Sequence, residues 1–194
     1  MNRKLILIGT TVAVVLAFVA GVVAFNSHSN REAAQVARAN NDALVRPHAP
    51  VFGNPAAKVT IVEFFDPACE TCRAFYPIVK RMVNASFGQV RLVLRYAPLH
   101  QGSDRAVKIL EAARQQGKYW EAVERTLAAQ PQWAAHHSPQ PELIWALLGG
   151  LGLDIGRAKA DADGQAIEQL LRQDIADMQA LGVNRTPGFF VNGA

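Results

Sequence analysis

Cysteine is scarce in this chain: among 194 residues there are two, Cys69 and Cys72. A structural zinc site normally takes four Cys or His ligands and usually two CxxC pairs, and one pair does not supply them. The histidines show no paired ligand spacing with the cysteines, apart from the adjacent His136-His137. The pair therefore favours redox chemistry, while a metal site completed by histidine and an inert structural disulfide remain alternatives.

Several other signatures are absent. The sequence has no phosphate-binding loop, no Ser–His–Asp order and no nucleotide-binding fingerprint. Lys and Arg are scattered, the formal net charge is +4, and no basic run is interleaved with aromatic residues. A nucleic-acid partner is therefore not expected.

The two cysteines stand at a boundary between two patterns. The apolar, β-type run Val59–Phe65 precedes them, and a helical pattern follows. Two thiols at this spacing on the first turn of a helix can close a small disulfide ring. The helix N-terminus, with its unpaired N–H groups and partial positive charge, stabilises a thiolate on the first cysteine. We therefore expect Cys69 to have a lowered pKa and to act as the nucleophile in dithiol–disulfide exchange, a chemistry that needs no organic cofactor.

The N-terminus carries a long apolar run. Arg3 and Lys4 precede residues Leu5 to Phe25, which include no charged side chain. A helix over this run would be roughly 30 Å long, the thickness of the hydrocarbon core of a bilayer. We predict a single-pass signal anchor over 1–25 in the cytoplasmic membrane, with the positive-inside bias directing the rest of the chain to the periplasm or cell exterior. A cleaved signal peptide, which would leave a soluble periplasmic protein, is the alternative. Either location lets disulfides persist.

A polar segment separates this run from the folded domain. Residues Asn26 to Pro50 include few large apolar side chains, and the Ala-rich stretch Asn30–Leu44 is able to form a short helix before two prolines interrupt it. We interpret 26–50 as a polar linker and 51–194 as the catalytic domain. His48 has no functional interpretation.

The centre of the domain is predicted to be a strand, a helix and a second strand. The β-branched and aromatic run Val59–Phe65 predicts a buried strand. Residues Cys69 to Asn84 show helical spacing of apolar side chains, with Pro77 as a kink, and Gln89 to Tyr96 alternate as a strand. Elements in this order form a parallel crossover unit.

A long helical region follows the second strand. The expected helices are Asp104–Gln116, Tyr119–Ala129, Glu142–Leu151, Ile155–Ala162 and Ala166–Leu181. We interpret the region 103–181 as a helical insertion, interrupted notably by the loop 131–141. Trp120, Trp133 and Trp145 lie in this insertion and either pack in the core or line an aromatic groove for unfolded substrates.

Two ionisable residues near the cysteines are candidates for the site. Glu63 lies within the apolar strand, and because burial raises the pKa of a carboxyl group, it could take up and return the proton of Cys72. The alternative is that Glu63 points to an exposed face of the strand. His100 follows the second strand, at the end of the sheet where parallel α/β folds place their sites, and either approaches the cysteines or is an ordinary loop histidine. His136-His137 is interpreted as exposed loop.

The chain closes on a turn signal. Phe189–Val191 is strand-like, and Asn192-Gly193 is a strong hairpin-turn signal that predicts a partner strand. The sequence supplies no such strand. We therefore expect that it lacks the final strand and helix of the fold and is a fragment of a longer reading frame.

These features together resemble the thioredoxin superfamily, and more closely its DsbA-like branch of bacterial envelope thiol–disulfide oxidoreductases. The resemblance covers about Val51 to Ala194 and rests on Val62-Glu63-Phe64-Phe65, Cys69-Glu70-Thr71-Cys72, Pro77, the helical insertion and Thr186-Pro187 before Phe189-Phe190-Val191-Asn192-Gly193. It implies a thioredoxin fold, α/β in class, with the insertion between the second strand and a cis-proline loop.

The same resemblance implies roles for the site residues. Cys69 would be the exposed attacking cysteine, Cys72 the resolving cysteine and Glu63 the buried proton-transfer acid. Thr186-Pro187 would form a cis-proline loop against the disulfide and pair with the extended chain of a substrate. The implied partners are cysteine-containing envelope proteins and a membrane or soluble redox partner that renews the CxxC pair.

One departure from the family bears on redox strength. Glu70-Thr71 stands where strongly oxidising members have Pro-His, and an acidic Glu70 should disfavour the Cys69 thiolate, which predicts a weaker oxidant. We therefore predict a thiol–disulfide oxidoreductase that exchanges disulfides with envelope proteins. The alternatives are a reductase that serves cytochrome or metal-site assembly, and a metal-binding chaperone that uses the same cysteines and a histidine.

Overall fold

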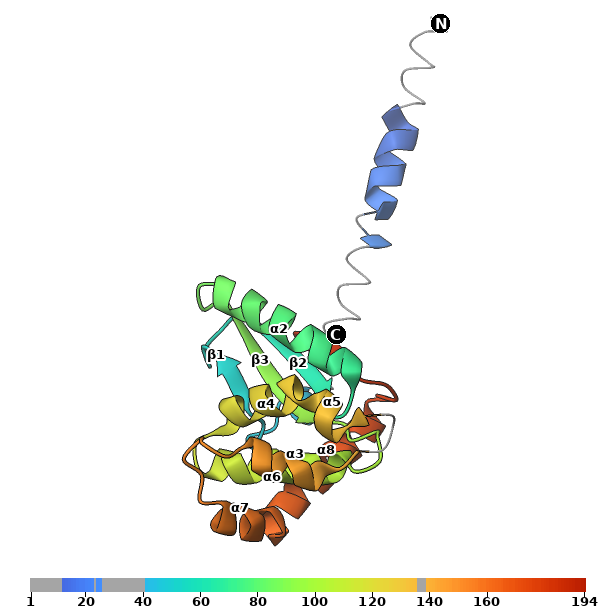
Figure 1. Cartoon of the computed structure of the whole chain (residues 1–194). Helices are drawn as coiled ribbons and strands as arrows, with labels where there is room; N and C mark the ends of the chain where they lie inside the picture. Colours follow the sequence, from blue (N-terminus) through green and yellow to red (C-terminus); the bar gives the residue numbers. More distant parts are fainter. Residues whose placement is uncertain (1–11, 23, 26–40, 136–138) are drawn as a thin grey trace, which may run out of the picture.

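The computed structural model describes residues 12–22, 24–25, 41–135 and 139–194. Four strands form one sheet in the order β1-β3-β2-β4 (Figure 1). The central strands β2 (Val59–Phe65) and β3 (Val90–Tyr96) are parallel, which confirms the predicted crossover. The outer strands β1 (Val51–Gly53) and β4 (Gly188–Val191) run antiparallel to their neighbours.

The two central strands are buried because both of their faces are covered. Side chains alternate between the faces of a strand, so that Ile61 and Phe65 join a core cluster with the helix α2, whereas Val62 and Phe64 join a second cluster on the opposite face. Glu63 belongs to the same set as Ile61 and Phe65 and therefore points to the α2 side of the sheet.

Helix α2 (Glu70–Ala85) connects β2 to β3 and carries the cysteines near its start. Its buried residues are Cys72, Tyr76, Val79 and Val83, a spacing of three and four that places them on one face. Pro77 lies inside the helix, as predicted. This packing fixes the first turn of α2 beyond the carboxyl end of β2.

The remaining helices form a body beside the sheet (Figure 1). They are α3 (Ser103–Gln115), α4 (Tyr119–Ala128), α5 (Gln130–Trp133), the 3-10 helix η2 (Pro141–Leu143), α6 (Ile144–Leu147), α7 (Ile155–Ala162) and α8 (Gln165–Ala180). The predicted insertion is thereby confirmed. Trp133 and Trp145 are buried and Trp120 packs against the same core cluster, so the core interpretation of the tryptophans holds and the aromatic groove is wrong.

Two details of the insertion differ from the prediction. The expected helix Glu142–Leu151 is instead η2 followed by the short α6, because the chain turns at Gly150, whose φ of +79° favours glycine. The expected loop 131–141 begins with α5. Its buried Trp133 donates a hydrogen bond from Nε1 to the carbonyl of Thr126 at 2.8 Å, which holds this segment against α4.

The segment before β1 packs onto the sheet. Leu44 and Ala49 are buried against Val62 and Phe64 on the face opposite α2. Residues 41–50 therefore belong to the folded domain, and the interpretation of 26–50 as a linker is wrong for these last ten residues. Leu44 is the large apolar side chain that this segment buries fully, while Val45 packs against the same cluster and the ion pairs of Arg46 and His48 complete the contact.

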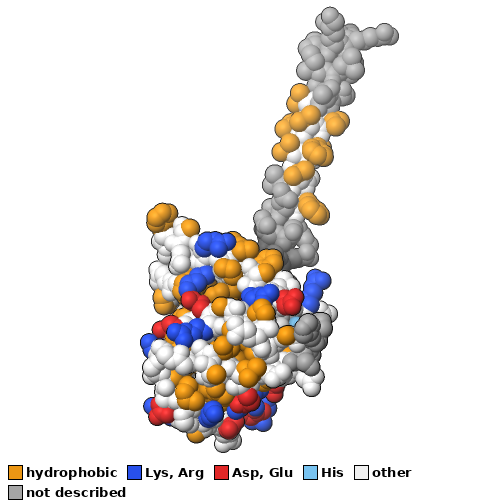
Figure 2. Space-filling view, in the orientation of Figure 1, with side chains coloured by type: hydrophobic (Ala, Val, Ile, Leu, Met, Phe, Trp, Pro, Cys, Tyr) orange, Lys and Arg blue, Asp and Glu red, His pale blue; other side chains and the backbone are white. Residues whose placement is uncertain are grey.

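The predicted N-terminal anchor lies partly outside the described residues, which omit 1–11 and 23. Residues 12–22 are helical, and hydrophobic side chains such as Val14 and Phe18 are exposed along them (Figure 2). Among the parts of the chain that the structure describes, no helix is both long and apolar enough to cross a membrane. On the visible face of the folded domain, Lys and Arg side chains are interspersed with acidic ones (Figure 2), in agreement with the scattered charge of the sequence.

At the other end of the chain, β4 pairs with β2, and the predicted turn at Asn192-Gly193 is present. Both residues have positive φ, 50° and 90°. The Asn192 side chain oxygen accepts a hydrogen bond from the Thr60 N–H at 2.9 Å, which ties the turn to β2.

Candidate active site

Cys69 is the N-cap residue of α2. Its backbone is extended, and its Sγ accepts a hydrogen bond from the backbone N–H of Cys72 at 3.4 Å. An N-cap side chain normally satisfies one of the free N–H groups of a first helical turn, and here a sulfur takes that position. The Cys69 thiol also lies 3.4 Å from the carbonyl oxygen of Thr186, to which it donates.

This environment favours the thiolate of Cys69. A hydrogen bond from the Cys72 side chain is the largest influence and lowers the pKa of Cys69 to about 5, with further lowering by the Thr186 side chain and by the backbone N–H groups of Cys72 and Thr71. Burial opposes this shift. Cys69 is 5% exposed, so the exposed position that the resemblance implied for this cysteine is wrong, and its sulfur is reached through the cleft that it lines. The predicted lowering of the Cys69 pKa therefore holds, but its largest cause is the Cys72 side chain, and the N–H groups at the start of the helix contribute less than predicted.

Cys72 has the opposite character. Its side chain is fully buried, and the pKa of its thiol is raised by the hydrogen bond it makes to Cys69 and by burial, with a smaller contribution from the charge of Glu63. Both cysteines are free thiols in the structure. At neutral pH the pair thus consists of one thiolate and one thiol.

Glu63 is buried beneath this pair. It is fully shielded from solvent, and neither of its carboxyl oxygens has a hydrogen-bond partner among the described residues. Burial, and then the negative charge of Cys69, raise the pKa of Glu63 to about 8. The exposed alternative for Glu63 is therefore wrong, and a carboxyl group that holds or releases a proton near neutral pH lies on the α2 side of the sheet.

Thr186 and Pro187 lie on the other side of Cys69. Their peptide bond is cis, as the resemblance implied, and β4 follows directly. The pairing of Gly188 with Phe64 brings the start of β4 to the end of β2. The residues just before β4 therefore lie next to the residues just after β2. This places Thr186 beside the sulfur of Cys69, which is more than a hundred residues earlier in the sequence.

Asp66 is a buried residue that sequence reasoning missed. Its Oδ1 accepts hydrogen bonds from the Ala68 N–H at 2.9 Å and the Ser103 hydroxyl at 2.5 Å. Its Oδ2 accepts from the Leu99 N–H at 2.8 Å and from the backbone N–H of His100 at 3.0 Å, and also lies 2.7 Å from the His100 Nδ1. One carboxylate therefore joins the turn that carries the cysteines to the turn after β3. An Asp directly after an apolar strand was the available signal.

Gln130 also supports the motif and was not predicted. Its Nε2 donates to the carbonyl of Pro67 at 2.8 Å and to that of Cys69 at 3.0 Å. Gln130 is buried and belongs to α5, so the insertion holds the start of α2 directly. No local pattern identifies this residue, because a lone Gln in a helical segment has many possible roles.

A cleft of about 730 Å³ opens beside Cys69. The lining residues come from the start of α2, the turn after β3 and the segment after α5: Ala68, Cys69, Glu70, Thr71, Leu99, His100, Gln101, Ala134 and Pro139. His100 thus reaches the same cleft as the cysteine, although no hydrogen bond between the two is found among the described residues. Of the two expectations for His100, the structure favours the one in which it approaches the cysteines.

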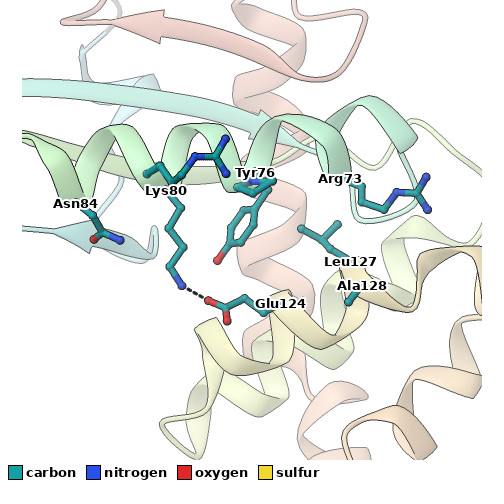
Figure 3. Close-up of a pocket in the computed structure, with 9 residues that line it drawn as sticks. Arg73, Tyr76, Lys80, Asn84, Glu124, Leu127 and Ala128 are labelled. Carbon is teal, nitrogen blue, oxygen red and sulfur yellow. Dashed lines mark hydrogen bonds and ion pairs between the residues drawn. The ribbon is translucent and has the colours of Figure 1, made fainter.

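A second hollow of about 410 Å³ lies between α2 and α4. The Tyr76 ring points from α2 toward α4, where Glu124 pairs with Lys80 (Figure 3). Burial, followed by the charge of Glu124, raises the pKa of Tyr76. This hollow is separate from the cleft because Cys69 is not among its lining residues.

In the described part of the chain, no group of three or more His, Cys, Asp or Glu residues is arranged to hold a metal ion. His136 and His137 lie outside the described residues. The metal-binding alternative therefore draws no support from the geometry.

Comparison with known proteins agrees with this geometry. Residues 46–194 match a family model described as Thioredoxin. A solved structure, a thioredoxin-like oxidoreductase from Silicibacter pomeroyi DSS-3, is 36% identical with a TM-score of 0.68, over 79% of this chain and 86% of that one. The thiol-disulfide exchange protein alpha-DsbA2 from Wolbachia pipientis shares the fold, with a TM-score of 0.72 at 22% identity over 86% of this chain and 88% of that one.

Curated relatives include an Na(+)/H(+) antiporter NhaA from Herminiimonas arsenicoxydans, 32% identical over 73% of this chain and 22% of the relative. An Na(+)/H(+) antiporter NhaA 3 from Salinispora tropica is 31% identical over 74% of this chain and 21% of the relative. The chain spans about a fifth of the length of the curated relatives it matches. From the family model, the solved relatives and the site geometry, the chain belongs to the thioredoxin superfamily and has the fold of the DsbA-like thiol–disulfide oxidoreductases.

Proposed function

We propose that this protein exchanges disulfides with cysteine-containing proteins of the bacterial envelope through Cys69 and Cys72. The observation that carries the proposal is the asymmetry of the two thiols. The pKa of Cys69 is lowered to about 5, whereas the pKa of the buried Cys72 is raised. A thiolate on the wall of a cleft next to a fully buried thiol is the arrangement that dithiol exchange needs, because the first sulfur attacks and the second resolves the mixed disulfide.

In the reducing direction, the Cys69 thiolate attacks one sulfur of a partner disulfide. A mixed disulfide forms, and the second partner sulfur leaves as a thiolate. Cys72 then gives its proton to Glu63 and attacks the Cys69 sulfur, so that the Cys69–Cys72 disulfide closes and the first partner sulfur leaves. Two electrons pass from the enzyme to the partner, and the oxidising direction is the reverse of these steps.

Glu63 suits the proton step because of its titration range. A carboxyl group with a pKa of about 8 is present in both protonation states near neutral pH, so it accepts the proton as Cys72 attacks and returns it as Cys72 leaves. Thr186 is proposed to pair with the extended chain of the partner, since its carbonyl lies 3.4 Å from the attacking sulfur.

The preferred direction follows from the stability of the thiolate. Stabilising the reduced form makes the disulfide a better oxidant, and the first cysteine has a pKa of roughly 7 in a reducing protein of this fold and roughly 3.5 in a strong oxidant. A pKa of about 5 for Cys69 lies between the two. We therefore propose a disulfide donor of intermediate strength.

The proposed location is the outer side of the cytoplasmic membrane, with the N-terminal helix as a signal anchor. The apolar run Leu5 to Phe25 and the exposed hydrophobic side chains along residues 12–22 support this location. Extraction of membranes with alkaline carbonate tests it: an anchored chain stays in the pellet, whereas a cleaved one appears in the soluble fraction with a lower mass.

The first test of function is a redox titration of the full chain against glutathione, with the state of Cys69 and Cys72 scored by thiol alkylation. A reversible two-electron transition at an oxidising potential is expected. A transition at a strongly reducing potential would instead make the protein an electron donor, and the absence of any transition in the folded protein would remove the exchange function.

Two variants separate the roles of the cysteines. Cys69→Ser is expected to abolish exchange, because it removes the attacking sulfur. Cys72→Ser is expected to accumulate mixed disulfides with partners, detected on non-reducing gels, because the resolving sulfur is gone. Equal and unchanged activity in both variants would contradict the mechanism.

A further inference from the structure

His100 and Asp66 form a fixed pair on the wall of the cleft that contains Cys69. Asp66 is fully buried, and every group around its carboxylate is a donor: the hydroxyl of Ser103 and the backbone N–H groups of Ala68, Leu99 and His100. These bonds hold the carboxylate in one orientation. His100 is attached to this support and its side chain is 40% exposed, so a rigid buried group carries an accessible one.

The pair determines which nitrogen of the imidazole carries a hydrogen. An ionised carboxylate only accepts hydrogen bonds, so the His100 Nδ1, at 2.7 Å from the Asp66 Oδ2, carries a hydrogen and donates it. The Nε2 is then the nitrogen that is free to bond to an occupant of the cleft. It has no hydrogen-bond partner among the described residues, and the ring lines the cleft.

His100 is not a partner of Cys69 itself. The Cys69 sulfur is bonded to the Cys72 N–H and to Thr186, and its lowered pKa is accounted for by those neighbours. The two residues between the cysteines, Glu70 and Thr71, include no histidine. The imidazole therefore enters the cleft from a different element and faces whatever occupies it.

We propose that His100, oriented by Asp66, is a catalytic residue that exchanges a proton with the sulfur of the partner protein. This inference rests on the proposed dithiol exchange and adds the group that serves the partner's side of the reaction. Glu63 serves Cys72 from beneath the helix, and His100 serves the incoming or departing sulfur from the cleft. Cys72 and the partner sulfur that reacts at Cys69 then exchange protons with different groups, while Cys69 itself leaves as a stabilised thiolate.

The proton balance is simple in both directions. When the Cys69 thiolate attacks a partner disulfide, the Cys69–partner bond forms, the partner's S–S bond breaks, and the departing sulfur takes the proton from the imidazolium Nε2. When a partner thiol attacks the oxidised enzyme, the neutral Nε2 takes the thiol proton, the new sulfur bond forms at Cys69, and Cys72 leaves with a proton from Glu63.

The test compares two disulfides with the reduced full chain and its His100→Gln variant. Bis(2-hydroxyethyl) disulfide releases a basic alkyl thiolate, whereas 4,4′-dithiodipyridine releases a sulfur that needs no proton. The rate of thiol–disulfide exchange depends on the basicity of the leaving sulfur, so the variant is expected to react about tenfold more slowly with the alkyl disulfide and at an unchanged rate with the pyridyl one. Alkylation of Cys69 by iodoacetamide, which involves no leaving sulfur, is expected to stay the same.

The matched control is His48→Gln. It also removes an imidazole that is hydrogen-bonded to a buried carboxylate, at 2.6 Å from Asp174, but its partner belongs to α8 and not to the cleft. The control is expected to react with both disulfides at the wild-type rates.

Three results would overturn the proposal for His100. Equal slowing of both disulfides and of alkylation would mean that the imidazole only supports Cys69, and unchanged rates throughout would mean that it takes no part. If the wild-type chain is alkylated at Cys69 but exchanges with neither disulfide, the proposed function itself fails, and the proposal fails with it.

Discussion

The two faces of the sheet both bury charge, and they do so in opposite ways. On the α2 face, Glu63 is buried without a hydrogen-bond partner among the described residues. On the other face, Arg95 is equally buried but pairs with Asp174 at 2.8 Å and Asp177 at 2.6 Å. Around this centre, Arg46 binds Asp177 and His48 binds Asp174.

The pKa values of the buried acids on the two faces reflect this difference. Burial and the charge of Cys69 raise the pKa of Glu63 to about 8. Burial also acts on Asp177, but the hydrogen bonds from Arg46 and Arg95 outweigh it and hold the pKa of Asp177 at about 2. A buried charge with partners is fixed in one protonation state and supports the fold, whereas a buried acid without partners titrates near neutral pH and can serve chemistry.

The largest expected effect comes from breaking the paired face. Arg95→Met leaves Asp174 and Asp177 next to an apolar side chain, and removal of one partner from a buried ion pair typically costs about 3–5 kcal/mol. Denaturant unfolding at pH 7 measures the loss. The pH dependence of Cys69 alkylation should stay at the wild-type position, because Arg95 points to the other face.

Arg91→Met is the matched control for this prediction. Arg91 lies on the same strand, but it has no carboxylate partner among the described residues. Its hydrogen bond to Thr60 is partly buried and its bond to the carbonyl of Pro55 is exposed, so its removal should cost less than about 1 kcal/mol. Equal losses in the two variants would show that the buried network has no special part in stability.

The next effect concerns the unpaired face and depends on pH. The raised pKa of Glu63 means that the folded state binds a proton more tightly than the unfolded state does, so stability is full below about pH 4.5 and falls as the pH rises toward 8. Glu63→Gln removes this dependence. Between pH 5 and pH 8 the wild type should lose about 3 kcal/mol more than the variant does.

Unfolding free energies of both proteins at several pH values test this expectation. Glu124→Gln is the control, since Glu124 pairs with Lys80 at the surface and should leave the wild-type pH dependence in place. Parallel curves for wild type and Glu63→Gln would mean that Glu63 does not titrate in this range.

The smallest effect is expected for an ion pair that is partly exposed, in contrast to the buried pairs of Arg95. The Lys80–Glu124 pair spans α2 and α4 at the edge of their hollow (Figure 3), and both side chains are partly exposed. Lys80→Gln should change stability by less than about 1 kcal/mol, because water and salt screen such a pair. A loss as large as that of Arg95→Met would show that exposure is not what separates the two kinds of ion pair.

Much of the architecture was predictable because it follows from local patterns. The central strands, α2 with its cysteines and the cis Thr186-Pro187 bond agree with the sequence-based expectations. Glu63 was identified for a physical reason, since an acid in an apolar strand is costly unless it has a use. The contact between Cys69 and Thr186 rested on resemblance, because no local pattern reports two segments so far apart.

The parts that were missed depend on tertiary partners. Residues 41–50 look polar, yet Arg46 and His48 are paired with carboxylates of α8, so the polarity marks a contact and not a linker. Asp66 likewise looks like a turn residue until the turn after β3 supplies its donors. A sequence shows that a polar group is present but does not show what it binds.

The double hydrogen bond of Gln130 has a consequence for protein engineering. Because one amide from the insertion holds two carbonyls at the start of α2, the Cys69-Glu70-Thr71-Cys72 segment is not an independent cassette. Transfer of these four residues to another host of the same fold would move the sulfurs without the brace that positions them. A faithful transplant must carry α5 as well, and the redox behaviour of chimaeras should follow the origin of their insertion as closely as the origin of their cysteines.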